Sequence, residues 1–188
     1  MKIKLGCAVS IVLLVSGCLA EENSPKDWSL FKSGAGFTVK YPSSWFRKGI
    51  DSSELMILSS RGGAEAIIIT RGQAMIFVKE EQQYLDSPLS QVEDHYVQDG
   101  RVISRKNIHN GGAETRMASH LTEIVVIEPV VPPEDVPIPV SNVIYTMFFC
   151  EIDGHKYVTV SKNFEGDKRQ TAYQQTALRV AESIRRVE

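Results

Sequence analysis

The segment Val143–Ile152 constrains the fold most, because it is apolar on both faces of a strand. Alternation divides its apolar residues into two sets, with Val143, Tyr145, Met147 and Phe149 on one side and Ile144, Phe148, Cys150 and Ile152 on the other. A strand of this kind belongs in the middle of a sheet that is covered on both faces. Asp153-Gly154 then predicts a tight hairpin, so we expect His155–Phe164 to return beside it.

Two amphipathic helices are predicted, and they are candidates to cover the two faces of that sheet. The first follows Ser87 and Pro88, an N-cap residue and a favoured first helical residue. Its apolar face consists of Leu85, Leu89, Val92 and Tyr96. The second helix is predicted over Lys168–Val187, with an apolar stripe of Tyr173, Ala177, Val180, Ile184 and Val187.

Shorter apolar or alternating runs predict the remaining strands. They are Phe37–Tyr41, Leu55–Leu58, Ala66–Thr70, Gln73–Val78, Arg101–Ile108 and Thr115–Ile127. The first two apolar runs after Pro42, Leu55–Leu58 and Ala66–Thr70, are expected to be joined by a turn. Because short turns connect most of these strands, the predicted fold class is α+β, with a largely antiparallel β-sheet sandwiched between helices.

The N-terminus has the pattern of a bacterial lipoprotein signal. Lys2 and Lys4 precede an apolar stretch, and the small residues Ser16 and Gly17 precede Cys18. The stretch is shorter than the roughly 20 residues that span a bilayer. We therefore expect residues 1–17 to be removed and the Cys18 thiol to carry lipid; an ordinary secretory signal and an uncleaved anchor are the alternatives.

This signal implies a domain organisation and a location. Residues 18–27 are expected to be a polar tether, and residues 28–188 one folded domain. The protein would be a membrane-anchored lipoprotein facing the periplasm or the cell exterior, at the outer membrane if the host is Gram-negative. Without residues 1–17 the chain carries 19 basic and 23 acidic residues, a balance that argues against nucleic-acid binding.

Three stretches resemble the PsbP-like family, whose founding member is an extrinsic photosystem subunit. They are Gly36–Trp45 with its proline turn, the hairpin at Asp153-Gly154 with Tyr157, and Gly166–Arg169 leading into the last helix. The resemblance implies an α-β-α sandwich and a non-catalytic role in binding or stabilising protein assemblies. Residues 129–139 have no counterpart in the photosynthetic members, which favours secreted bacterial lipoproteins of this fold over a photosystem-associated lumenal lipoprotein.

Side chains capable of catalysis or metal binding occur without a recognised motif. The histidines His95, His109, His120 and His155 form no zinc-binding spacing, and no nucleophile elbow occurs. We expect His95 and its neighbours Glu93 and Asp94 to form a solvated helix face, and His155 to lie at the surface. The sequence therefore predicts neither an enzyme nor a cofactor or metal site.

Two further residues are interpreted as core. Cys150 lies in an apolar run, where a free thiol behaves as a small buried hydrophobe. Trp45 follows the proline turn and is expected to anchor the core rather than to present a ligand platform.

The proline-rich stretch is the candidate partner surface. Five of the eight prolines fall between Pro129 and Pro139, so a loop or an extended edge segment is expected there. The candidate contact residues are Pro129, Val131, Pro132, Pro133, Val136, Pro137 and Ile138. A preorganised extended segment loses little entropy when a protein docks on it. A rigid crossover packed on its own domain is the alternative.

These features together predict a lipid-anchored, extracytoplasmic, non-catalytic binding or assembly module with a protein partner. A small-molecule or metal-ion carrier lipoprotein of the same fold is the alternative, and an unrecognised enzyme is a third hypothesis. A deep pocket with converging polar groups would favour a carrier or an enzyme. An exposed apolar patch would favour the binding module.

The lipid anchor gives a direct prediction. Replacement of Cys18 by Ser should move the protein from the membrane to the soluble fraction, because the several acyl chains of a lipoprotein hold it at the bilayer at about 0.8 kcal/mol per buried methylene. Fractionation at high salt measures this. A Cys18→Ser variant that still sediments with membranes would contradict the lipoprotein assignment.

Overall fold

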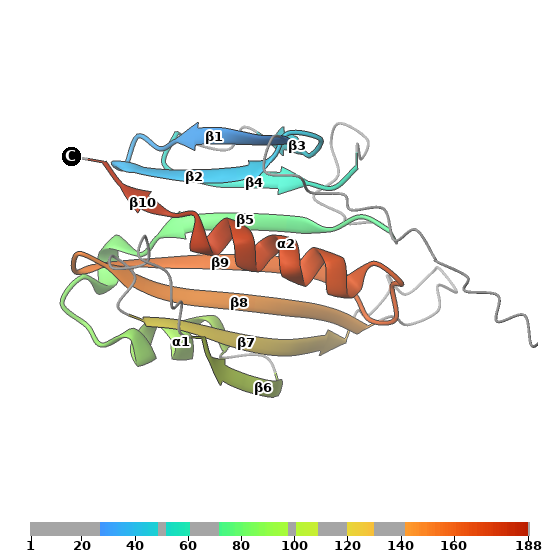
Figure 1. Cartoon of the computed structure of the whole chain (residues 1–188). Helices are drawn as coiled ribbons and strands as arrows, with labels where there is room; N and C mark the ends of the chain where they lie inside the picture. The colour runs from blue at the N-terminus through green and yellow to red at the C-terminus, as the bar shows by residue number, and fades with distance from the viewer. Residues whose placement is uncertain are drawn as a thin grey trace, which may run out of the picture.

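The computed structural model describes residues 27–48, 52–60, 72–97, 101–108, 120–129 and 142–187. Seven of the described strands form one sheet in the order β3-β4-β5-β9-β8-β7-β6 (Figure 1). Their bounds are Phe46–Lys48 (β3), Leu55–Leu58 (β4), Met75–Glu80 (β5), Arg101–Asn107 (β6), His120–Pro129 (β7), Asn142–Ile152 (β8) and His155–Phe164 (β9). Three strands form a second, smaller sheet, with β2 between β1 and β10: Trp28–Lys32 (β1), Phe37–Pro42 (β2) and Arg185–Arg186 (β10).

Every described pair of neighbouring strands is antiparallel. β8 and β9 lie near the centre of the large sheet and pair from Val143 with Phe164 to Ile152 with His155. At the turn between them, both Asp153 (φ 49°) and Gly154 (φ 78°) have the left-handed conformation that a tight two-residue hairpin turn requires. The predicted hairpin is confirmed.

The two faces of β8 and β9 contribute to different cores. The first core contains Phe148, Cys150 and Ile152 of β8, packed with β2, β4 and β5 and with the second helix. Within it Tyr157 is fully buried and meets Phe37 of the small sheet edge to face, with ring centroids 5.4 Å apart. The second core contains Met147 and Phe149 together with Val92 of the first helix. The strand that the sequence marks as apolar on both sides is therefore covered on both.

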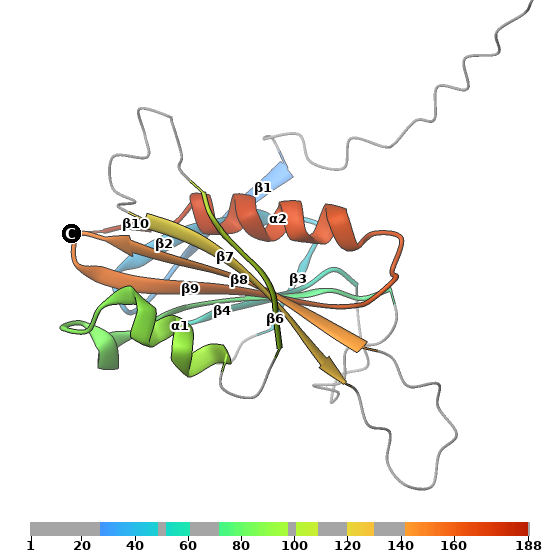
Figure 2. The same cartoon turned by 90° about the horizontal axis from the view of Figure 1, so that it is seen from below.

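The helices lie on opposite sides of the sheet (Figure 2). Helix α2, Gln170–Glu182, packs on the first-core face, and helix α1, Leu89–Val97, packs on the second-core face. A short 3-10 helix, Gln82–Tyr84, connects β5 toward α1. The α+β sandwich with a largely antiparallel sheet is confirmed.

The predicted terminal helix is five residues too long at its C-terminal end. The chain leaves the helix after Glu182 and forms β10, where Arg185 pairs with Thr38 and Arg186 with Phe37. Ile184 is still buried as predicted, but Val187 is 49% exposed. The helical spacing of apolar residues continues in the sequence past Glu182. The last residues nevertheless form a strand, because β2 of the small sheet offers them a hydrogen-bonding partner.

Two predictions for the first helix are also wrong in detail. Leu85 precedes the helix and is 42% exposed, whereas Val92 is buried as expected. Glu93 is buried rather than solvated, and its carboxylate lies 3.5 Å from the guanidinium of Arg105 on β6. His95 and Asp94 are exposed, as predicted.

Most predicted strands are present, with shifted ends. β4 pairs directly with β5, and Ala66–Thr70, predicted as a strand joined to Leu55–Leu58 by a turn, lies outside the described residues. β7 runs through Pro129, which pairs with Asn142, so this proline ends a strand rather than starting a loop. The sequence analysis missed β1, β3 and β10, which are short or pack on only one side.

A row of polar side chains lies buried along β9 on the first-core face. Thr159, Ser161 and Asn163 are each at most 1% exposed. Within the described part of the chain, their hydroxyl and amide groups have no hydrogen-bond partner. Across the hairpin, the equally buried Thr146 accepts a hydrogen bond of 3.0 Å from Gln174 on α2. Buried polar groups without partners lower stability.

This contrast gives a matched pair of predictions. Thr159→Val should raise the free energy of unfolding by about 1 kcal/mol, because it removes a buried hydroxyl that has no partner. Thr146→Val should lower it by about 1 kcal/mol, because Gln174 loses its acceptor. Urea denaturation measures both. Changes of the same sign would contradict the hydrogen-bond assignment.

Candidate functional site

The outer face of β4 and β5 carries an apolar patch that neither core covers. Met56 pairs with Phe77 and Leu58 with Met75, so these four side chains form one block on the sheet surface. All four are half-buried and none belongs to either core. Their strand neighbours Leu55, Ile57, Ile76 and Val78 point the other way, into the first core. We call Met56, Leu58, Met75 and Phe77 the apolar patch.

Helix α1 covers the same face of the sheet, but over other strands. Its Val92 packs on residues of β7, β8 and β9. In Figure 1, α1 lies at the β6–β7 side of the sheet, away from β4. Phe46 on β3, which pairs with Leu58, adds a side chain that is 38% exposed at the margin of the patch. Among the described residues, a helix therefore covers this face over β7 to β9 but not over β4.

Lysines surround the apolar patch. Lys48 pairs with Met56, Lys162 pairs with Met75, and Lys79 follows Phe77 by two residues on the same face. The Lys79 ammonium lies 3.2 Å from the carboxylate of Glu81, and that of Lys162 lies 4.9 Å from the centroid of the Tyr145 ring. Three lysines therefore lie at the margin of the patch, and one of them, Lys79, is paired with Glu81.

The end of β5 forms a separate polar cluster. The Glu80 side chain is 3% exposed, and its Oε1 lies 2.5 Å from His155 Nδ1 and 3.6 Å from Arg186 Nη1. Glu80 Oε2 has no hydrogen-bond partner in the described chain. Burial raises the pKa of the Tyr157 hydroxyl, against the lowering effect of its hydrogen bond from Arg186. This cluster joins β5 and β9 of the large sheet to β10 of the small one.

His155 was expected at the surface; its side chain is 27% exposed, and its ring also takes part in this cluster. Its position after a hairpin turn leaves part of the side chain exposed, while Glu80 at the end of β5 contacts Nδ1. No sequence signal links Glu80 to His155, since 75 residues separate them.

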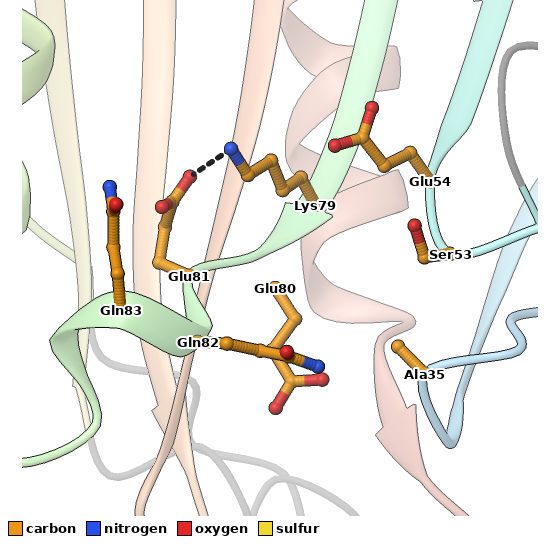
Figure 3. A pocket seen from close by; sticks show the side chains of 8 residues that line it. All are labelled: Ala35, Ser53, Glu54, Lys79, Glu80, Glu81, Gln82 and Gln83. Atoms are coloured by element: carbon orange, nitrogen blue, oxygen red, sulfur yellow. Dashed lines mark ion pairs between the residues drawn. The ribbon is translucent and has the colours of Figure 1, made fainter.

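Glu81 points to the other side and borders a pocket of about 260 Å³ (Figure 3). Its carboxylate contacts Lys79 and accepts a short hydrogen bond from the Tyr96 hydroxyl. The pKa of Tyr96 is raised above its usual range; burial is the largest cause, and this hydrogen bond to Glu81 is the next. The contacts of Glu81 with Lys79 and with Tyr96 thus tie α1 to the end of β5.

A second pocket, of about 480 Å³, lies at the start of α2 beside Gly72. Arg169 donates to the carbonyl of Gly72 there, at 2.5 Å. Among the residues that the structure describes, no group of three or more His, Cys, Asp or Glu side chains could hold a metal ion. In the same residues, neither helix is long and apolar enough to cross a membrane.

Most residues of the predicted functional sites lie outside the described ranges. This holds for Cys18 and for the candidate partner residues Val131, Pro132, Pro133, Val136, Pro137 and Ile138. It also holds for His109. The backbone of Pro129 lies at the end of β7, at the same edge of the hairpin as Asn142.

The two residues interpreted as core are confirmed. Cys150 is 2% exposed, and burial raises the pKa of its thiol to about 12, so the reactive thiolate is scarce at neutral pH. Trp45 is partly buried against the first core and meets Tyr173 of α2 edge to face, with ring centroids 5.9 Å apart.

No protein-family model and no curated protein sequence matches the chain. Its fold, however, matches solved structures. The Ran-binding protein Mog1p of Saccharomyces cerevisiae superposes with a TM-score of 0.52 at 10% identity, over 86% of this chain and 96% of Mog1p. A Mog1 mutant gives 0.51 at 10% identity, over the same shares of the two chains. A Pseudomonas aeruginosa protein of unknown function gives 0.45 at 13% identity, over 81% of this chain and 94% of that one. At 10% identity, the two Mog1 structures show a shared fold only.

The contacts of Glu80 with His155 and Arg186 are expected to hold β10 against the large sheet. Glu80→Ala should lower the free energy of unfolding by about 2 kcal/mol, because it leaves Arg186 and His155 without their shared acceptor. It should also speed amide exchange at Val187, whose N–H donates to Gly36. Glu80→Gln should cost less, because an amide oxygen can still accept. Equal losses for Ala and Gln, with β10 exchange unchanged, would contradict this role.

Proposed function

We propose that the protein is a non-catalytic binding module, held at a membrane surface by lipid on Cys18, and that its partner is a protein. The lipoprotein signal supports the anchor and an extracytoplasmic location. The resemblance to the PsbP-like family supports a role in binding, and so does the fold shared with Mog1p, which is described as a Ran-binding protein. We carry over from Mog1p only that this fold can serve protein binding.

The apolar patch is the observation that carries the proposal. Two methionines, a leucine and a phenylalanine lie together on a part of the sheet that neither described helix covers, and all four are only half-buried. Contiguous apolar surface with a polar rim is typical of protein interaction sites. Methionine suits such a surface, since its flexible thioether adapts to different partners.

The rim narrows the chemistry of the partner. Lys48 lies beside Met56 and Lys162 beside Met75, so a partner with an apolar centre and acidic groups at these two points fits the patch best. An amphipathic helix meets this description and would continue, over β4 and β5, the layer that α1 begins over β7 to β9.

Co-purification from detergent-solubilised membranes tests the proposal. Met56→Gln combined with Met75→Gln keeps side-chain length but makes the patch polar, and it should reduce recovery of the native partner at least about tenfold. Leu30→Gln is the control, because Leu30 is 53% exposed on β1, in the other sheet. A patch variant that melts like the wild type and retains every partner would contradict a binding role for the patch.

The proline-rich stretch remains part of the proposal as a second contact region. Replacement of residues 130–139 by a Gly/Ser loop of equal length should leave the fold intact, since the cost of loop closure grows slowly with length. Reduced partner recovery would assign Val131, Pro132, Pro133, Val136, Pro137 and Ile138 to the interface. Unchanged recovery would leave the stretch a structural crossover.

A further inference from the structure

Strand β6 differs from every other described strand in the large sheet, because all seven of its residues are exposed. It lies at the end of the strand order and pairs on one side with β7; among the described residues nothing pairs with its other side. Two of its residues are apolar, Val102 (38% exposed) and Ile103 (48% exposed). An open edge of this length offers backbone donors and acceptors to an incoming extended chain.

The charge on β6 has one sign. The strand contains Arg101, Arg105 and Lys106 and no acidic residue. The guanidinium of Arg105 lies 3.5 Å from the carboxylate of Glu93 on α1, and the Arg105 side chain is 52% exposed. Arg101 and Lys106 pair with Ile127 and Glu123 of β7, which places the two cations on the same face of the sheet.

A bulge between Val102 and Ser104 explains why Arg101 and Lys106, five positions apart, lie on the same face of the sheet. The register shifts by one residue there, so Val102 and Arg105 share the α1 face although they are three positions apart. Bulges and positive charges on edge strands disfavour pairing with a second copy of the same edge. The same features leave the edge open to a chain of opposite charge.

We infer that β6 binds an extended acidic segment of a partner protein by strand addition, in a ladder along its free edge with carboxylates against Arg101 and Lys106. Backbone hydrogen bonds supply affinity, Val102 and Ile103 supply apolar contact, and the two cations select acidic over basic sequences. This surface lies at the opposite end of the strand order from the apolar patch. It therefore stands or fails independently of the proposed function.

Peptide binding to the full-length lipoprotein in neutral detergent tests the inference. The probe is a capped octapeptide of alternating valine and glutamate, and the comparison peptide has lysine for glutamate. The glutamate peptide should bind at least about tenfold more tightly. Arg101→Glu combined with Lys106→Glu should weaken it about tenfold, and each single change should weaken it several-fold. Lys32→Glu, a single charge reversal on the edge strand β1, should alter it by less than about twofold.

Two further measurements separate strand addition from charge attraction alone. An N-methylated glutamate peptide, which cannot donate backbone hydrogen bonds, should lose binding, and the unmodified peptide should slow amide exchange in β6. Absence of binding by the glutamate peptide, equal binding of the lysine or the methylated peptide, or equal weakening by Lys32→Glu would each overturn the inference. Because neither patch methionine is changed, these outcomes are distinct from failure of the proposed function.

Discussion

Burial of both faces of the β8–β9 hairpin is the constraint on which the rest of the structure depends. Phe148, Cys150 and Ile152 require cover on one side, and Met147 and Phe149 require it on the other. Helix α2 with the small sheet provides the first cover, and α1 provides the second. Since burial of apolar area contributes about 25 cal/mol per Å², losing either layer would expose a full core face. The Glu80 cluster then fastens the small sheet, through β10, to the large one.

Coverage of the two faces is unequal, and this inequality produces the candidate binding surface. The first-core face is covered by α2 and also by β1, β2 and β10. The second-core face has α1 alone among the described elements, positioned over β7 to β9. Met56, Leu58, Met75 and Phe77 therefore remain half-buried at the other end of that face. A protein partner on this surface would extend the layer that α1 forms among the described elements.

The central architecture could be predicted from the sequence, whereas the surfaces could not. Alternation in residues 143–152, the Asp153-Gly154 turn and the stripe of α2 are local signals. The first two appear where expected, and the stripe does so as far as Ile184. The run Leu55–Leu58 is apolar on both faces of the strand, a pattern that indicates complete burial. Met56 and Leu58 are nevertheless only half-buried, because α1 docks over β7 to β9 and not over β4. Likewise, no local signal shows that β6 lies at an edge. The Glu80–His155 contact joins residues far apart in sequence, which hydrophobic spacing does not encode.

The central claim is that this protein is a binding module that contacts a protein partner through the apolar patch. Site-specific photocrosslinking in native membranes tests this claim most directly. A benzophenone analogue of phenylalanine at Phe77 preserves the ring and reports on neighbours of the patch. The account predicts a discrete protein adduct at Phe77 and none from the same analogue at the exposed Arg179 of α2. Absence of an adduct at Phe77 in correctly folded, membrane-bound protein, or equal labelling at both positions, would contradict it.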